Sequence, residues 1–402
     1  IIYLFTFFIK PFKKTKIILF ESVPDLSDSA KALYDYLMQK KINKSYKIYW
    51  LVNEPKEYSS KKMDNTYFIT KKHNKKFKYI KTMFIMSIAD YCFFTHCFVG
   101  NKYNKHQVRC FLMHGTSFKN LKNVYKDFFV DVTDAIVTSK FTEEIHCQTK
   151  QGVEGKCHVL GYPRNDMLYI NQKEKNNLKR IFNLKDDKKI ILWLPTFKHS
   201  NVDNRNDLNE LTPSDVGIIS ENNLNEINNE LEKYNIVLIL KPHPGQDMKY
   251  FNIKENTNIK IMKDKDLIDN NYTLYQFMAV TDALITDFSS AYVDYLLLDK
   301  PIAFEIENIE QYKNGIGFSI DNPLDYMPGM LMKNKDDLIK FIESLNLNQD
   351  KYDKERKKMK NLFHTYKDNK SSERIIKYFK IGEEKWKSTK LVLFKEHLIY
   401  FT

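Results

Sequence analysis

Four short segments of the sequence combine residue types that can move a proton and bind phosphate. They are His114-Gly115-Thr116-Ser117, Pro195-Thr196-Phe197-Lys198, Pro242-His243-Pro244 and Asp287-Phe288-Ser289-Ser290. Histidine titrates near neutral pH, so His114, on a turn that Gly115 makes flexible, is a candidate general base. The prolines on either side of His243 restrict the backbone and would hold that side chain in place. Each segment taken alone also has an ordinary structural explanation, as a turn or a helix cap.

The segment from Asp287 to Ser290 is expected to open a helix. Hydroxyls and free backbone N–H groups at a helix N-terminus form an anion site that suits a diphosphate. The glycine patterns GxGxxG and GxxxxGK[ST] do not occur in the sequence. Their absence argues against a dinucleotide-dependent dehydrogenase and against a P-loop NTPase.

Each of the four segments follows a run of apolar residues of strand length. Such runs occur at 17–20, 48–52, 67–69, 91–95, 109–113, 134–139 and 158–161, and again at 190–194, 236–240, 259–262, 283–286 and 302–304. Helical stretches lie between them, at 30–40, 78–87, 173–182, 221–234, 274–280 and 289–298. Nearly continuous apolar runs indicate strands that are covered on both faces, and their alternation with helices predicts doubly wound parallel sheets. Ligands of such sheets bind beyond the carboxyl ends of the strands, which is where the four segments fall.

The pattern restarts after residue 170, so 402 residues are expected to form two Rossmann-like domains. The predicted boundaries are a segment at 1–16, an N-terminal domain at 17–170, a C-terminal domain at 171–380 and a basic tail at 381–402. The Lys-rich helical region from 336 onward could cross back to the first half.

Asp264-Lys265-Asp266 is interpreted as a solvated turn. The five cysteines form no CxxC pair, so we expect reduced thiols and no metal site.

The formal charge of +13 is confined to the first third of the chain. Residues 1–130 hold 24 Lys and Arg against 9 Asp and Glu, and the remainder holds 40 against 42. This asymmetry indicates an anionic partner, namely a membrane surface, a polyphosphate or a nucleic acid. Only 6 of the basic residues are Arg, which weakens the nucleic-acid interpretation. The apolar start, Ile1–Ile9, is too short to span a bilayer, and it is either an interfacial segment or part of a core.

Taken together, the motifs resemble those of the CDP-glycerol glycerophosphotransferase family of teichoic-acid and capsule polymerases and primases. The matching residues, in order, are His114-Gly115-Thr116 with Lys119, Thr138-Ser139, Gly161-Tyr162-Pro163-Arg164-Asn165-Asp166, Pro195-Thr196-Phe197-Lys198, Lys241-Pro242-His243-Pro244, Thr286-Asp287-Phe288-Ser289-Ser290 and Pro328-Gly329. The resemblance covers roughly residues 15–380. It implies a GT-B-like α/β enzyme with two domains facing a cleft, without a metal or a cofactor. CDP-glycerol, or CDP-ribitol in close relatives, would be the co-substrate.

The resemblance also implies a role for each matching residue. His114 would deprotonate the acceptor hydroxyl, which attacks the β-phosphate and releases CMP, while His243 offsets the developing charge. The implied donor-binding residues are Thr196, Lys198, Thr286, Asp287, Ser289 and Ser290. The implied acceptor- and phosphate-binding residues are Gly115, Thr116, Lys119, Arg164 and Asp166. Lys198 stands where the family usually has Arg, and Ile316-Gly317-Phe318 stands where it often has an Arg-Gly pair before an aromatic residue.

The expected partners are a CDP-polyol donor, a lipid-linked or polymeric acceptor and the anionic cytoplasmic face of the cell membrane, where the protein would be peripheral. No nucleic acid is expected, and a homo-oligomer remains open. One alternative is a GT-B glycosyltransferase that uses a nucleotide sugar for cell-surface polysaccharide. Another is a non-catalytic protein that binds membranes or nucleic acid through its basic first third.

Overall fold

The computed structural model describes most of the chain. The described residues are 15–58, 63–72, 76–96, 107–116, 118–120, 131–150, 152–196, 217–243, 246, 253–315 and 317–382. Most of the predicted segments 1–16 and 381–402 therefore lies outside them. In the part of the chain that is described, no helix is both long and apolar enough to cross a membrane.

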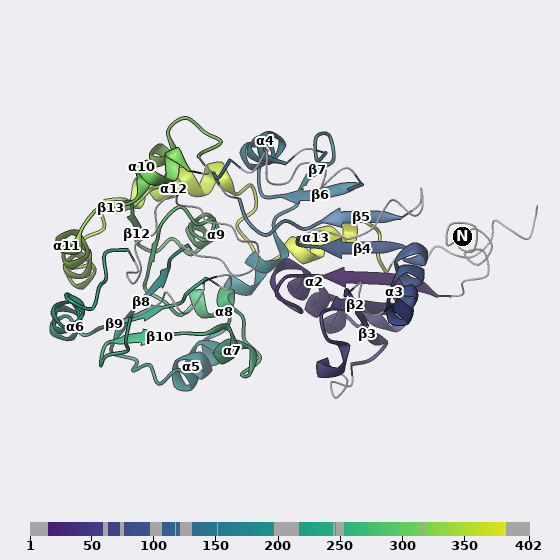
Figure 1. Ribbon diagram of the computed structural model, residues 1–402, viewed down its shortest axis with the longest axis horizontal. Coiled ribbons are helices and arrows are strands. Elements are labelled where there is room, and N and C mark those ends of the chain that lie inside the picture. The colour runs from purple at the N-terminus through teal and green to yellow at the C-terminus, as the bar shows by residue number, and fades with distance from the viewer. Residues whose placement is uncertain are drawn as a thin grey trace, which may run out of the picture.

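The first half of the chain forms a parallel sheet that is seven strands wide in the described residues (Figure 1). Its strands are β1 (Lys16–Glu21), β2 (Tyr46–Val52), β3 (Thr66–Thr70), β4 (Tyr91–Phe94), β5 (Val108–Phe111), β6 (Asp134–Val137) and β7 (Cys157–Val159). They lie in the order β3-β2-β1-β4-β5-β6-β7. The order reverses between β1 and β4, and a reversal of this kind opens a crevice at the carboxyl ends of the two strands.

The second half forms a six-stranded parallel sheet of the same kind. Its strands are β8 (Lys189–Leu194), β9 (Ile236–Leu240), β10 (Ile259–Ile261), β11 (Ala283–Thr286), β12 (Ile302–Glu305) and β13 (Met330–Met332). The order β10-β9-β8-β11-β12-β13 reverses between β8 and β11. The prediction of two doubly wound parallel-sheet domains is therefore confirmed.

Helices cover both faces of each sheet and close its core. The helices are α2 (Asp28–Gln39), α3 (Lys76–Ile88), α4 (Lys140–Thr149), α5 (Gln172–Ile181), α6 (Leu224–Lys233), α7 (Asp264–Ile268), α8 (Leu274–Met278), α9 (Ala291–Tyr295), α10 (Ile309–Asn314), α11 (Lys335–Asn346), α12 (Asp353–Phe363) and α13 (Ser371–Tyr378). The central strands β1, β8 and β9 are buried along nearly their whole length, as the continuous apolar runs predict; Trp50 and Trp193 are fully enclosed. Burial of this apolar surface is the main source of stability for such sheets.

One expectation from the sequence is wrong, and one strand was not predicted. Asp264-Lys265-Asp266 is not a solvated turn but the start of α7, where the Asp266 carboxylate accepts a hydrogen bond of 2.7 Å from the Lys263 N–H. Acidic residues stabilise the first turn of a helix, which explains the local composition. The strand β13 was not predicted, because its apolar run, Met330-Leu331-Met332, is only three residues long and partly exposed.

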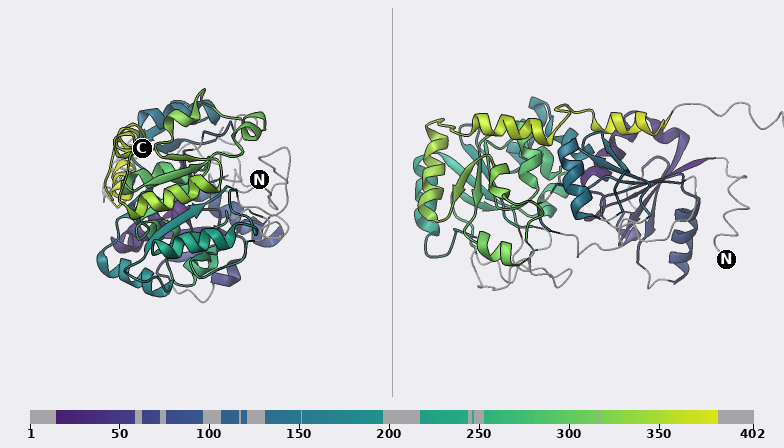
Figure 2. Two further views of the ribbon diagram at one scale, coloured as in Figure 1. Left: turned by 90° about the vertical axis from the view of Figure 1, so that its left-hand side faces the viewer. Right: turned by 90° about the horizontal axis from the view of Figure 1, so that it is seen from above.

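The C-terminal helices return to the first half, as the sequence suggested. Figure 2 shows α12 and α13 along one side of both halves. Helix α12 contacts α4, and α13 contacts α2. Ile375 and Ile376 of α13 belong to the same buried cluster as the first sheet. The two halves are thus joined by the returning chain as well as by the direct link between them.

Candidate functional site

The candidate site lies where the carboxyl ends of the two sheets come together. The turn after β5, at Gly115, touches the start of α9, at Ser290. A Cβ atom added to Gly115 would lie 2.3 Å from the Ser290 Oγ and 2.9 Å from an Arg164 nitrogen. Gly115 also has φ of +127°. Any side chain would be strained here by backbone and by contact, so glycine is required for this approach.

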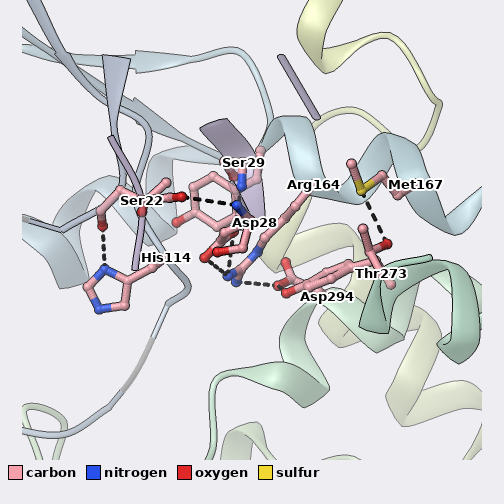
Figure 3. Close-up of polar contacts among 12 residues, drawn as sticks. Ser22, Asp28, Ser29, His114, Arg164, Met167, Thr273 and Asp294 are labelled. Carbon is pink, nitrogen blue, oxygen red and sulfur yellow. Dashed lines mark hydrogen bonds and ion pairs between the residues drawn. The ribbon is translucent and has the colours of Figure 1, made fainter. Parts of the chain in front are cut away.

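The imidazole of His114 is held in one tautomer (Figure 3). Its Nδ1 lies 2.8 Å from the backbone carbonyl oxygen of Thr95. A carbonyl oxygen can only accept, so Nδ1 carries the proton and Nε2 keeps its lone pair. Burial, the neighbouring His96 ring and the Lys150 charge hold the pKa of His114 well below its usual value. The ring is therefore neutral near pH 7, and Nε2 can accept a proton as a general base must.

The turn that carries His114 is fixed by unusual backbone and by side-chain contacts. Met113, immediately before the histidine, has φ of +58°, a conformation that non-glycine residues rarely adopt. The Thr116 hydroxyl lies 2.9 Å from the hydroxyl of Tyr162 and is almost completely buried. Strained backbone of this kind persists only when the surrounding structure holds it, and it is concentrated at functional sites.

On the opposite side, Asp287 ties together the loops after β8 and β11. One of its carboxylate oxygens accepts from the Thr196 N–H at 2.8 Å and from the Thr196 hydroxyl at 2.6 Å. The other accepts from the Ser289 N–H at 3.2 Å. The Thr286 hydroxyl donates to the Leu194 carbonyl at 2.7 Å. These bonds place four of the predicted donor-binding residues at the reversal point of the second sheet.

The helix expected to start at Ser289 begins at Ala291. The Ser289 hydroxyl accepts from the Ala291 N–H at 3.3 Å, whereas the Ser290 side chain makes no capping bond. Lys119 is nearly buried, and its charge acts to lower the Asp287 pKa, which burial raises. A cation and a hydroxyl thus lie beside the same helix start.

Arg164, predicted to bind phosphate, is buried in a network that joins the two halves (Figure 3). It lies on the 3₁₀ helix η4 (Pro163–Leu168). Its guanidinium donates at 3.2 Å to both oxygens of Asp28, at the start of α2. It also donates at 2.5 Å to Asp294 of α9, which accepts in addition from the Tyr275 hydroxyl. Two carboxylates therefore compensate its charge.

Other predicted residues have separate positions. The Asp166 carboxylate accepts from the backbone N–H groups of Ser371 and Ser372 and so caps α13. His243 is exposed at the end of β9, at the same sheet edge as Thr196. Lys198 lies outside the described residues. The described residues hold no group of three or more His, Cys, Asp or Glu side chains arranged for a metal ion.

Sequence reasoning missed several buried titratable groups around His114. His96 stacks on the His114 ring with a centroid distance of 4.3 Å. Glu21 ends β1, and burial raises its pKa to about 7. Lys150 donates to His146 Nδ1 at 2.8 Å, and His146 Nε2 lies 2.9 Å from the Tyr162 hydroxyl. The sequence did contain a signal for such groups, namely an ionisable residue at the end of an apolar strand, and Glu21 is an example.

Comparison with known proteins gives consistent results. A family model described as CDP-Glycerol:Poly(glycerophosphate) glycerophosphotransferase matches residues 2–380. A teichoic acid poly(glycerol phosphate) polymerase of Bacillus spizizenii is 26% identical over 366 residues, which cover 84% of this chain and 86% of the relative. A teichoic acid glycerol-phosphate primase of Bacillus subtilis is 25% identical over 265 residues, which cover 65% of this chain but only 60% of that protein.

Among solved structures, the wall teichoic acid polymerase TagF superposes on this chain with a TM-score of 0.73. The two chains are 20% identical, and the match covers 95% of this chain and 93% of the TagF chain in that structure. At this identity the likeness shows a shared two-domain fold.

Proposed function

This chain belongs to the CDP-glycerol:poly(glycerophosphate) glycerophosphotransferase family, and we propose that it transfers glycerol phosphate, or a related polyol phosphate, from a CDP-activated donor to an acceptor hydroxyl during synthesis of a teichoic-acid-like or capsular polymer. The observation that carries this proposal is the neutral His114 ring, with Nε2 unprotonated, at the point where the two halves touch. The names of the polymerase and primase relatives support the donor class.

In the proposed reaction the acceptor hydroxyl loses its proton to His114 Nε2. The freed oxygen attacks the β-phosphorus of the donor, a new P–O bond forms, and the bond from the β-phosphorus to the bridging oxygen breaks. That oxygen leaves with the α-phosphate as CMP. General base catalysis of this kind contributes about 10²–10⁴-fold to the rate. Because His114 must be neutral to act, its lowered pKa keeps the base active below neutral pH.

The second half of the chain is proposed to hold the donor. Ser289 and Ser290 lie at the start of α9, and Thr196 and Asp287 fix the loops around it. His243, Lys119 and Lys198 would offset the negative charge that develops on the phosphoryl oxygens, as positioned cations do in phosphoryl transfer. Gly115 and Thr116 would lie against the acceptor.

The first half is proposed to approach a polyanionic acceptor on the membrane. Residues 1–130 carry a net charge of +15, from 24 basic and 9 acidic residues. Each basic residue near an anionic lipid surface contributes about 1 kcal/mol. We therefore propose a lipid-linked or polymeric acceptor and a peripheral position on the cytoplasmic face of the membrane.

A donor screen with three proteins tests the proposal. Nucleotide release is measured for wild type, His114→Ala and His158→Gln, as CMP with CDP-glycerol and CDP-ribitol and as UDP with UDP-glucose. His158 is a suitable control because it is a partly buried histidine paired with Asp134 and Tyr378, away from the turn at Gly115. We expect CMP from a CDP-polyol, a loss of about 10²–10⁴-fold in His114→Ala and near wild-type turnover in His158→Gln.

Two outcomes would contradict the proposal in different ways. Turnover of the nucleotide sugar alone would replace glycerophosphate transfer by glycosyl transfer. Turnover of a CDP-polyol by His114→Ala within a few-fold of wild type would leave the reaction class standing and remove His114 as the base. Titration with CDP, which needs no base, checks that the variant still binds a donor.

A further inference from the structure

We infer that His96 is a positioning residue for the base, and that the stacked His96 and His114 rings act as a pair that keeps His114 neutral and oriented. This inference rests on the proposed role of His114. It concerns a histidine that follows β4, eighteen positions before the base in the chain.

The two rings are arranged as a stack. Their centroids are 4.3 Å apart and their planes differ by 11°. His96 thus covers one face of the His114 ring, while the Thr95 carbonyl accepts the hydrogen bond from the ring edge. The Thr95 hydroxyl lies 3.0 Å from His96 Nδ1, so the same dipeptide also holds the second ring. Two adjacent residues fix His114 in its plane and in its tautomer.

Stacking of two imidazoles has an electrostatic consequence that stacking of an imidazole on a hydrocarbon ring lacks. A proton on one ring places a positive charge within about 4 Å of the other, and like charges at that distance oppose each other. The pair therefore takes up its protons one after the other, and the second proton binds at a lower pH than it would on a single ring. Burial lowers the pKa of both rings as well.

The charged groups that face the two rings come from five elements, four of them around His96. Lys71, after β3, and Arg164, on η4, oppose protonation of His96, whereas Asp28 of α2 favours it. The Asp28 carboxylate is already paired with Arg164, which limits its effect. Glu21, at the end of β1, accepts from the backbone N–H of His96 and is paired with Lys71.

His114 faces cations in addition to the His96 ring. Lys150, at the end of α4, and Arg164 both disfavour a charge on it. None of the leading influences on its pKa is a carboxylate. The surroundings of the pair as a whole thus favour the neutral base, and His96 is the neighbour that also sets the plane of the ring.

The pH dependence of turnover distinguishes this role from simple packing. His96→Phe keeps a flat ring in the stack and removes its proton site, whereas His96→Ala removes both. We measure kcat and kcat/KM for CMP release from about pH 4.5 to about pH 8.5 in wild type, both variants and His158→Phe. We expect the acid limb of kcat/KM to move upward by on the order of one pH unit in His96→Phe, because the base no longer has a cationic neighbour on its face.

His96→Ala should show the same upward movement together with a fall in kcat of about tenfold, since the ring of His114 is then free to tilt. His96→Phe should recover most of that fall. His158→Phe should match wild type at every pH. If His96→Phe does not fold, as judged by its melting curve and by CDP titration, His96→Gln supplies the uncharged variant and the same movement is expected.

An acid limb that stays at the wild-type pH in the uncharged variants overturns the inference, whatever happens to kcat. A fall in kcat for His96→Ala that His96→Phe does not reverse overturns the part that concerns orientation. If His114→Ala retains turnover, the proposed base and this inference both fail. If His114→Ala is inactive and the limb does not move, only the inference fails, so the two failures can be told apart.

Discussion

Replacing Lys150 by Met should stabilise the protein, and the gain should shrink as the pH rises. Lys150 directly follows α4 and is only 3% exposed, and its ammonium group donates a hydrogen bond of 2.8 Å to His146 Nδ1. In the described part of the chain it forms no ion pair with a carboxylate. Burial lowers its pKa from 10.5 to about 8. The folded protein therefore keeps a charged lysine near neutral pH against a desolvation penalty.

The size and sign of the effect follow from that shift. A difference of roughly 2.5 pKa units corresponds to about 3 kcal/mol. Between about pH 8 and about pH 10.5 the unfolded chain binds more protons than the folded one, so the stability contributed by this site rises with pH. The penalty is fully present below pH 8 and disappears toward pH 10.5. From about pH 7 to about pH 9 the advantage of Lys150→Met over wild type should fall by about 1 kcal/mol.

Denaturant unfolding followed by tryptophan fluorescence measures this difference, because Trp50 and Trp193 are buried in the two sheets. Lys140→Met is the matched control. Lys140 begins the same helix, is exposed and pairs with Glu143, so it stays charged in both states over this range. Its effect on stability should not depend on pH. The loss of the hydrogen bond to His146 changes the stability of Lys150→Met by the same amount at each pH of this range. It therefore alters the size of the difference from wild type but not its dependence on pH.

The reasoning is refuted if Lys150→Met and wild type keep a constant difference at the two pH values. A constant difference would mean that Lys150 in the folded protein is either neutral at both pH values or hydrated at both. A lower stability of Lys150→Met that does not depend on pH would show that the bond to His146 outweighs the burial of charge, and it would contradict the predicted sign.

Two further predictions concern the contact between the halves and the membrane. Gly115→Ala should lower kcat by more than tenfold and lower the melting temperature, because the new methyl group collides with Ser290 and Arg164 and the backbone φ is +127°. Gly155→Ala controls for backbone strain, because Gly155 also has a positive φ but an added methyl group there meets no atom within 4 Å. Equal kcat in the two variants would contradict a close approach at Gly115. Sedimentation with phosphatidylglycerol vesicles should fall steeply as salt is added, because the charge on residues 1–130 is screened beyond about 8 Å at physiological salt. Equal, negligible pelleting at low and high salt would contradict the membrane-surface proposal.

Much of the fold could be predicted because its signal is local. A strand covered on both faces must be apolar along its length, so runs such as Ile190–Leu194 and Ile236–Leu240 identify themselves without knowledge of their neighbours. The positions of His114, Thr196 and Asp287 follow from the same logic, since each comes just after such a run. The strand β13 is apolar as well, but it is only three residues long and partly exposed, and it depends on pairing with β12.

The partners of the site residues could not be predicted because they are set by strand order and by the packing of the two halves. Arg164 meets Asp28 and Asp294, which are 136 and 130 positions away and lie on opposite halves. His96 reaches His114 because β4 and β5 are adjacent in the sheet. No spacing in the sequence distinguishes a histidine that stacks on the base from one that faces solvent. The sequence by itself determined which residues stand at the ends of the strands, and the tertiary structure decided which of them touch, because contact depends on how the sheets are ordered and brought together.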